Sequence, residues 1–149
     1  MFRGRYEHNV DAKGRLALPS SYRRLLADAG ADHLVVTTHI SDPCLVAYPP
    51  DEWAAFEKQL AKRPQFNEGV MLMRRLYVGN AHDCGIDKQG RILLPPTHRA
   101  YAKLEKGACW VGGIRTLEIW AADAWQDDVE GQRNKVGPQI LSQLSELGI

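Results

Sequence analysis

The chain repeats one short sequence. Residues 11–19 read DAKGRLALP and residues 87–95 read DKQGRILLP, so the two stretches lie 76 positions apart. Further along, LVAY at 45–48 matches LEIW at 117–120 at an offset of 72. The chain therefore holds two copies of a unit of about 45 residues, which are too few and too long for a solenoid. The 149 residues suit one ordinary domain or two small ones, and both copies must fit within them.

Each copy predicts the order strand, turn, strand, helix, strand, strand. In the first copy a short strand precedes Asp11. A turn follows because an aspartate accepts hydrogen bonds from its own downstream backbone and Gly14 accommodates a positive φ. Residues 15–18 alternate polar and apolar, which is typical of a half-buried strand. Pro19 cannot continue a strand ladder but suits the first turn of a helix, so we expect a helix to begin there.

The second copy predicts the same elements. Its helix begins at Pro95 and is expected to end at Gly107, as the first helix is expected to end near Gly30. Two short strands follow each helix, at 33–39 and 44–49 in the first copy and at 108–113 and 116–121 in the second.

Helical spacing of apolar residues marks a linker and a tail outside the repeats. Trp53 and Phe56 indicate one linker helix and Val70 and Met73 a second. Met71 and Met73 could suggest a cofactor pocket, but packing is the better explanation of these two side chains. A tail stripe of apolar residues is expected to dock on the body or on a neighbouring subunit; its members are Ile140, Leu141, Leu144 and Leu147. The predicted division is 1–53 for the first repeat, 54–78 for the helical linker, 79–125 for the second repeat and 126–149 for the C-terminal helical tail.

Positive charge is concentrated in the two repeated segments. The whole chain has a formal net charge of +1, yet residues 1–25 hold six basic and two acidic side chains, and residues 87–106 hold five and two. The rest of the chain is therefore net negative. Such an asymmetry steers a polyanion to one face, although chance in a small sample is the alternative explanation.

The sequence offers no sign of an enzyme, a metal site or a cofactor site. The usual nucleophile, zinc-protease, P-loop and dinucleotide motifs are absent. His82, Asp83 and Cys84 are adjacent, but neighbours on a strand point to opposite faces and would not converge. The three cysteines are far apart with no CxxC, which argues against a disulfide framework or a zinc site. No apolar stretch approaches the ~20 residues of a membrane helix, and no signal peptide is evident, so we expect a cytoplasmic protein.

The repeated turn has two interpretations, which can coexist. Asp11 and Arg15 could pair across the turn and brace it, although an exposed pair contributes only ~0–1 kcal/mol. Alternatively, the arginine fork could bind guanine O6 and N7 or a phosphate in a DNA groove, with Lys13 as a phosphate contact. On either interpretation the aspartate organises the turn, and Gly14 and Gly90 allow close approach of the backbone.

The stretch DAKGRLALPSSYRRLL resembles the N-terminal signature of the SpoVT-AbrB superfamily of bacterial regulators. Two such copies, each with Asp-x-x-x-Arg, together with the opening MFRG, are similar to the MraZ family. The resemblance implies an α+β fold: a tandem AbrB-like swapped-hairpin β-barrel built from two pseudo-symmetric ββαββ repeats, with linker helices and a C-terminal helix.

The resemblance also implies a function. It suggests a nucleoid-associated, DNA-binding transcriptional regulator, mainly a repressor, that binds double-stranded DNA at direct repeats in the promoter of its own division and cell-wall operon and assembles into a ring homo-oligomer. The expected DNA-binding residues are Arg15, Lys13, Arg91, Lys88 and Arg3, and the turn-organising residues are Asp11, Gly14, Asp87 and Gly90. Possible additional DNA contacts are Arg23, Arg24 and Arg99.

The second copy has Ala100 where the first has Arg24, so the two halves need not contact DNA equally.

Two other functions stay open. A ring-forming scaffold or protein-interaction module without specific DNA binding is the main alternative. RNA binding is less favoured because the motif supplies no pair of exposed aromatic residues for stacking.

Overall fold

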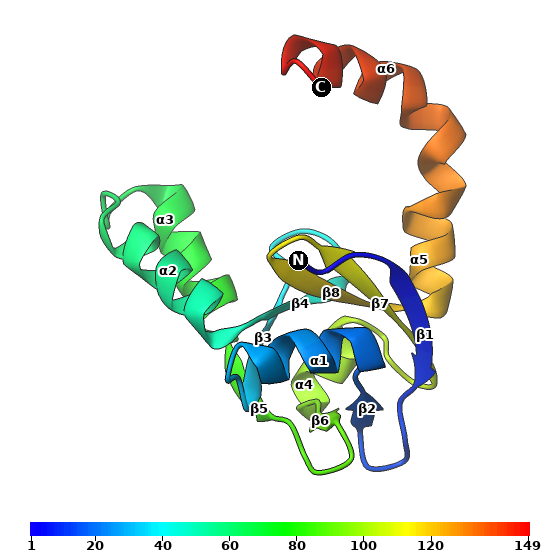
Figure 1. Ribbon diagram of the computed structural model, residues 1–149. Helices are drawn as coiled ribbons and strands as arrows, with labels where there is room; N and C mark the ends of the chain where they lie inside the picture. The colour runs from blue at the N-terminus through cyan, green and yellow to red at the C-terminus, as the bar shows by residue number, and fades with distance from the viewer.

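The structure, a computed structural model, describes residues 1–149 and combines two antiparallel sheets with several helices (Figure 1). The strands are β1 Arg5–Asn9, β2 Arg15–Ala17, β3 His33–Thr38, β4 Cys44–Tyr48, β5 His82–Gly85, β6 Arg91–Leu93, β7 Gly107–Gly113 and β8 Thr116–Ala121. The helices are α1 Ser20–Asp28, α2 Pro50–Ala61, α3 Glu68–Met73, α4 Pro96–Tyr101, α5 Ala122–Asp128 and α6 Arg133–Glu146. The predicted order of elements in each copy is confirmed.

Strands of the two copies interleave. The larger sheet has six strands in the order β1-β7-β8-β4-β3-β5, and β2 pairs with β6 in a separate two-stranded sheet. The first strand of each copy therefore pairs with a strand of the other copy, β1 with β7 and β5 with β3. The α+β class is confirmed. A closed swapped-hairpin barrel is not, because β1 and β5 are the two ends of the larger sheet and do not pair with each other.

The small β2–β6 sheet packs its apolar face on the core. Leu16 and Ile92 lie opposite each other in its register and are both completely buried. The Trp110 indole of the larger sheet is also completely buried, and its Nε1 donates a hydrogen bond to the Ala17 carbonyl at 2.9 Å. This bond ties the small sheet to the larger one, so the strands that follow the repeated turns start from a rigid base.

A side chain at the equivalent position of helices α1 and α4 bonds the backbone just before the first strand of its own copy. Tyr22 on α1 donates its hydroxyl to the carbonyl of Gly4 at 2.6 Å. His98 on α4, 76 positions later, bonds the carbonyl of Asn80 through Nε2 at 2.7 Å. Gly4 and Asn80 are themselves 76 positions apart and precede the first strand of their copies. The two halves thus share this contact although the side chains differ.

Helix α4 is shorter than predicted. It ends at Tyr101, and the predicted end at Gly107 is wrong. Lys103 adopts a left-handed conformation with φ +55°, as Gly30 does with φ +71° beyond the end of α1. The Leu104 amide then bonds the Arg99 carbonyl at 2.9 Å and the Leu104 side chain is buried, a common helix-ending geometry. Helix α4 has six residues against nine in α1, which accounts for most of the change in offset from 76 to 72.

The linker forms an arm that projects from the body (Figure 1). It begins with α2 at Pro50, four residues before the predicted boundary, and α3 continues into a π-helical turn over Arg74–Val78. At the base, Trp53 and Tyr77 are buried, and Met73 packs against them as expected. The buried Thr37 hydroxyl donates to the Tyr77 carbonyl at 2.6 Å, which ties the arm to β3.

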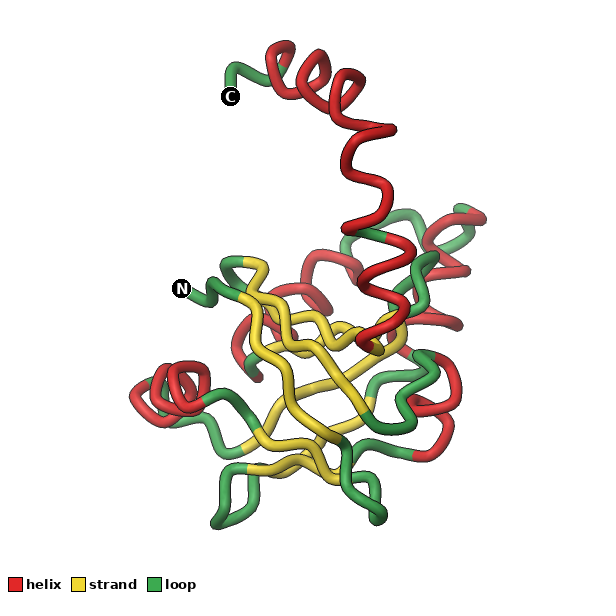
Figure 2. Tube along the Cα trace, turned by 90° about the vertical axis from the view of Figure 1, so that its right-hand side faces the viewer, coloured by secondary structure: helices red, strands yellow, loops and turns green.

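The tail leaves the body at the opposite side from the arm (Figures 1 and 2). Helix α6 does not lie on the chain's own body, and its apolar stripe is exposed, with Leu141 at 69% and Leu147 at 73%. The first of the two predicted partners of this stripe, the body of the same chain, is therefore wrong. None of the helices combines the length and the apolar character that a membrane crossing would require.

Candidate nucleic-acid interface

The two repeated turns, called here the first turn (residues 11–15) and the second turn (residues 87–91), project side by side from one end of the molecule (Figure 1). Their backbones make the same hydrogen bonds. In the first turn, Oδ1 of Asp11 accepts from the amides of Lys13 at 2.9 Å and Arg15 at 2.8 Å. In the second turn, Oδ1 of Asp87 accepts from the equivalent amides, both at 2.9 Å. The sequence repeat is therefore a repeat of conformation.

Each turn aspartate also holds the arginine of its motif. Nε of Arg15 donates to Oδ2 of Asp11 at 2.7 Å, and Nε of Arg91 donates to Oδ2 of Asp87 at 2.9 Å. These bonds, the backbone one from Arg15 first, lower the pKa of Asp11 to about 2. The pKa of Asp87 is lowered for the same reason. In each turn, one carboxylate thus both braces the backbone and orients the arginine.

Both arginines keep part of the guanidinium at the surface. The side chain of Arg15 is 32% exposed and that of Arg91 is 26% exposed. The terminal nitrogens of Arg15 make no hydrogen bond within the chain, whereas Nη2 of Arg91 donates to Gln89. An arginine held at Nε with free Nη groups can still offer a planar pair of donors to a base edge or a phosphate.

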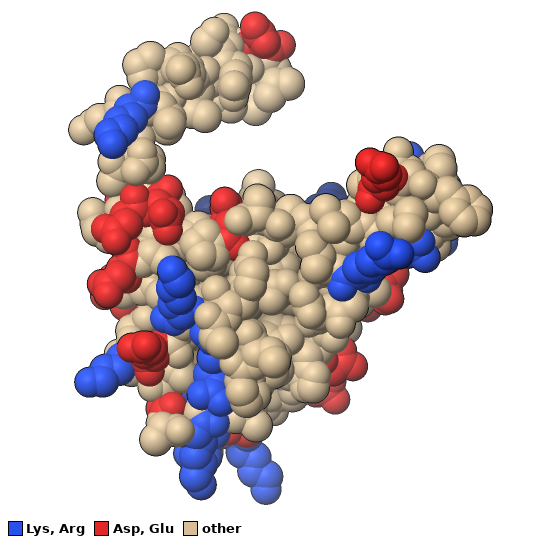
Figure 3. Space-filling model, turned by 180° about the vertical axis from the view of Figure 1, so that it is seen from behind, with Lys and Arg blue, Asp and Glu red and all other residues tan.

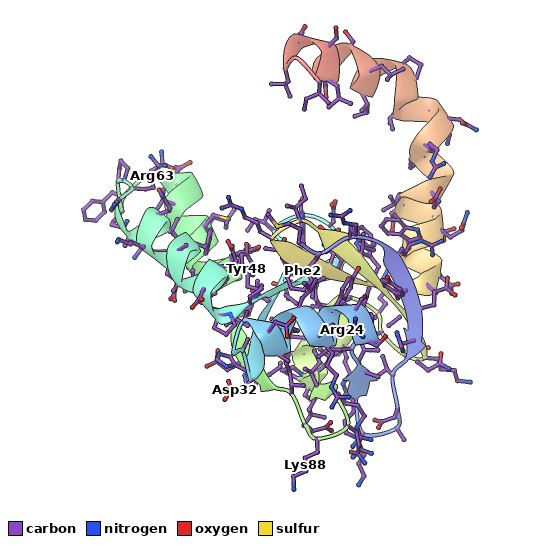
Figure 4. The ribbon with its side chains drawn as sticks, in the orientation of Figure 1. Phe2, Arg24, Asp32, Tyr48, Arg63 and Lys88 are labelled. Carbon is purple, nitrogen blue, oxygen red and sulfur yellow. The ribbon has the colours of Figure 1, made fainter.

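Lysines occupy the outer ends of the turns. Lys13 and Lys88 are exposed and form no ion pair, and Lys88 lies at the extreme end of the molecule (Figure 4). Figure 3 shows lysine and arginine side chains gathered at this end, whereas acidic side chains cluster where the tail begins. The charge asymmetry of the sequence is therefore also an asymmetry in space.

The turn glycines are covered by arginines of the other copy. Gly14 and Gly90 both have positive φ, +87° and +75°, and both are buried. A Cβ on Gly14 would lie 2.7 Å from Nε of Arg99, and one on Gly90 would lie 2.7 Å from Cδ of Arg23. The space beside each turn glycine is therefore occupied by an arginine of this chain.

The other predicted contacts lie away from the turns. Arg24 is exposed on α1 and makes no hydrogen bond or ion pair (Figure 4). Arg3 lies at the far end of β1, since Asn9 at the turn end of that strand pairs with Gly107, whereas Arg5 pairs with Val111. The structure therefore brings together Lys13, Arg15, Lys88 and Arg91, with Arg23 and Arg99 packed on the turn glycines, and leaves Arg3 and Arg24 outside this group.

Sequence reasoning missed the bonds that join the two turns. The Leu18 amide donates to the Gly90 carbonyl and the Leu94 amide donates to the Gly14 carbonyl, both at 2.9 Å. These bonds continue the β2–β6 ladder, in which Arg15 lies opposite Leu93. The only signal in the sequence is the repeat itself, which suggests a two-fold relation without saying which strands meet.

His82, Asp83 and Cys84, the adjacent residues considered in the sequence, lie on β5. His82 and Asp83 are exposed, whereas Cys84 is buried, and burial raises the pKa of its thiol to about 12. The Cys84 thiol is therefore separated from the exposed side chains of His82 and Asp83. No group of three or more histidine, cysteine or carboxylate side chains lies close enough to hold a metal ion.

Comparison with known proteins matches this chain to one family and to relatives that share one name. A family with the description "MraZ protein, putative antitoxin-like" matches residues 1–74 and 77–135. A protein of Pseudomonas aeruginosa named "Transcriptional regulator MraZ" is 46% identical over 125 residues, which cover 84% of this chain and 83% of that protein. A protein of the same name from Shewanella sediminis is 42% identical over 136 residues, covering 91% of this chain and 90% of the relative.

Proposed function

This chain belongs to the MraZ family, and from that membership we propose that it is a transcriptional regulator that binds double-stranded DNA with its two turns. The names of the relatives support the regulatory role. The observation that carries the DNA-binding role is the pair of turns with the same aspartate hydrogen bonds, fixed side by side and carrying Lys13 and Lys88. The interleaved sheets also support a place for this fold among the AbrB-like swapped-hairpin barrels.

The turns suit a DNA groove in their chemistry. Arg15 and Arg91 would read base edges, since a good two-point contact between arginine and guanine contributes about 1–3 kcal/mol of discrimination. Lys13 and Lys88 would contact phosphates, which positions the protein without reading sequence. A carboxylate that fixes Nε in advance reduces the side-chain entropy lost when DNA binds. Binding therefore needs little rearrangement of the turns.

We further propose that copies of the chain assemble head to tail into a ring. Apolar side chains are exposed on two separate projections, for example Phe66 at 95% on the arm and Leu141 at 69% on the tail. Two different patches on opposite sides favour a heterologous contact, which closes into a ring when the rotation allows it. A ring repeats its turns in one direction, which suits direct repeats in the promoter of its own division and cell-wall operon. Several weak contacts would then act together in repression on the nucleoid.

The test is binding to the DNA upstream of the protein's own coding region. Fluorescence anisotropy should show tight binding by the unaltered protein and loss of at least tenfold in affinity for Arg15→Ala, about 1.4 kcal/mol or more. Arg63→Ala, on the arm and far from the turns, is the matched control and should bind normally (Figure 4). Circular dichroism should show that both variants are folded. If Arg15→Ala unfolds or aggregates, bracing is its main role, and if it is folded and binds normally, the DNA contact is refuted.

The scaffold alternative has one observation in its favour, the exposed apolar residues of the arm and the tail. A salt titration separates the two functions. DNA binding through Lys13, Lys88 and the arginines should weaken log-linearly with salt, with a slope of about −0.9 for each phosphate contact. A flat salt response, or no preference for the upstream DNA over unrelated DNA, would favour the scaffold.

A further inference from the structure

We infer that Arg23 and Arg99 are positioning residues that lock the two turns into one unit, and that they influence DNA binding without touching DNA. The inference rests on the proposed DNA-binding function of the turns. It gives these arginines a different role from the additional DNA contacts expected from the sequence.

The first observation is that Arg23 reaches across to the turn of the other copy. Its Nη2 donates to the carbonyl of Lys88 at 2.9 Å, although the two residues are 65 positions apart. The same guanidinium covers Gly90, where a Cβ would lie 2.7 Å from Nη1 and 2.8 Å from Cζ. Hence Arg23, exposed on the helix of the first copy, contacts the second turn.

Arg99 makes the matching contact with the first turn. Its guanidinium covers Gly14, where a Cβ would lie 2.7 Å from both Cζ and Nε. Its Nε donates to the carbonyl of Leu94 at 3.2 Å, and the Leu94 amide in turn donates to the Gly14 carbonyl. The contacts are not identical, because Arg23 bonds the opposite turn directly and Arg99 does so through Leu94. The result is the same: each helix holds the turn of the other copy.

The contacts of Arg23 and Arg99 with the two turns have a consequence for DNA recognition. The two turns are joined by the Leu18–Gly90 and Leu94–Gly14 bonds, and the guanidiniums of Arg23 and Arg99 pack on the two turn glycines. The spacing of Arg15 and Arg91 is thus set before DNA arrives, and less conformational freedom is lost on binding. Nη2 of Arg23 and Nε of Arg99 are already bonded to carbonyls of the chain, so these two donors are not free for a phosphate.

Amide hydrogen exchange without DNA gives the first test. Arg23→Ala should speed exchange of the Leu18 and Gly90 amides by about five- to tenfold, the loss expected from one hydrogen bond. Arg99→Ala should do the same for the Leu94 amide. Arg24→Ala is the matched control, since Arg24 is the next residue on α1 and makes no bond, and it should leave these amides unchanged. Unchanged exchange in both Arg23→Ala and Arg99→Ala would overturn the lock.

DNA affinity gives the second test, with the upstream DNA as the probe. Arg23→Ala should bind about five- to tenfold more weakly, and Arg23→Lys should remain weakened, because lysine lacks the planar group that covers Gly90. A direct phosphate contact predicts the reverse, since a lysine would replace it. Full affinity in Arg23→Lys combined with unchanged exchange in Arg23→Ala would therefore assign a DNA contact and refute positioning.

The two tests separate failure of this inference from failure of the proposed function. If the unaltered protein does not bind its upstream DNA, or Arg15→Ala binds normally, the DNA-binding function fails, while the exchange experiment still reports whether the turns are locked. If Arg15→Ala abolishes binding but Arg23→Ala and Arg99→Ala change neither exchange nor affinity, only the positioning role fails.

Discussion

Replacing Gly90 with alanine tests the contact between the second turn and Arg23 through stability. The substitution has two effects. An alanine at φ +75° is strained by about 1–2 kcal/mol, offset by about 0.4–1 kcal/mol because alanine restricts the unfolded chain. The new Cβ would also lie 2.7 Å from Arg23 and displace it, which removes its hydrogen bond to Lys88, about 1 kcal/mol, and forces a poorer rotamer. We expect a total loss of about 2–3 kcal/mol.

Gly30→Ala is the matched control for the backbone effect. Gly30 has a similar φ, +71°, but a Cβ there would meet nothing within 4 Å. This variant should therefore lose only the backbone contribution, about 1 kcal/mol. The difference between the two variants isolates the displacement of Arg23.

Thermal and urea unfolding followed by circular dichroism measure both variants at one protein concentration. For a chain of this length, 1 kcal/mol shifts Tm by about 2–4 °C, so Gly90→Ala should lower Tm by about 4–12 °C and Gly30→Ala by about 2–4 °C. Adding Arg23→Ala to Gly90→Ala should cost less than the sum of the single changes, because the clash is relieved. Equal losses in Gly90→Ala and Gly30→Ala would refute the argument that Arg23 lies on Gly90.

The turn carboxylates, the buried thiols and the C-terminal helix each give a further test. Because the pKa of Asp11 is lowered to about 2, its hydrogen bonds should contribute fully to stability above pH about 4 and lose that contribution as the pH falls toward 2; a carboxyl NMR titration with a midpoint near 4 would contradict this. Because burial raises the pKa of Cys84 to about 12, a thiol reagent at pH 8 should label it far more slowly in the native protein than in urea, and prompt native labelling would exclude the buried placement. Deleting residues 133–149 should change the stability of the body by no more than about 1 kcal/mol but reduce the mass of any oligomer measured by light scattering; an unchanged mass would rule out the tail as a contact between copies.

Local patterns in the sequence predict the elements of each repeat well. The alternation at Arg15 to Leu18 and the proline that follows are read correctly because they depend on residues close in the chain. The end of α4 is not predicted, because lysine rarely adopts the left-handed conformation that Lys103 takes to bury Leu104. Tertiary packing decided that position, and the sequence pattern carries no sign of it.

The same distinction holds for the candidate site. The roles of Asp11 and Asp87 as turn organisers follow from turn chemistry within five residues and are seen in the hydrogen bonds. The contact of Arg23 with Lys88 spans 65 positions and depends on which strands pair across the repeat. No local rule gives that pairing, so the arginines behind the turns could be recognised as basic but not as supports.

Because the strands interleave, the first strand can pair only after most of the chain has been synthesised. Arg5 on β1 pairs with Val111 on β7, which the ribosome makes 106 residues later. At about 5–20 residues per second, the N-terminal strand waits roughly 5–20 s for its neighbour. Over that interval Phe2, which packs on Tyr22 and bridges to Ile114 in the finished protein, lacks the second of these neighbours. The nascent first half is therefore an incomplete body that needs the second to be translated, and a truncated messenger would yield a chain with an open edge and exposed core residues.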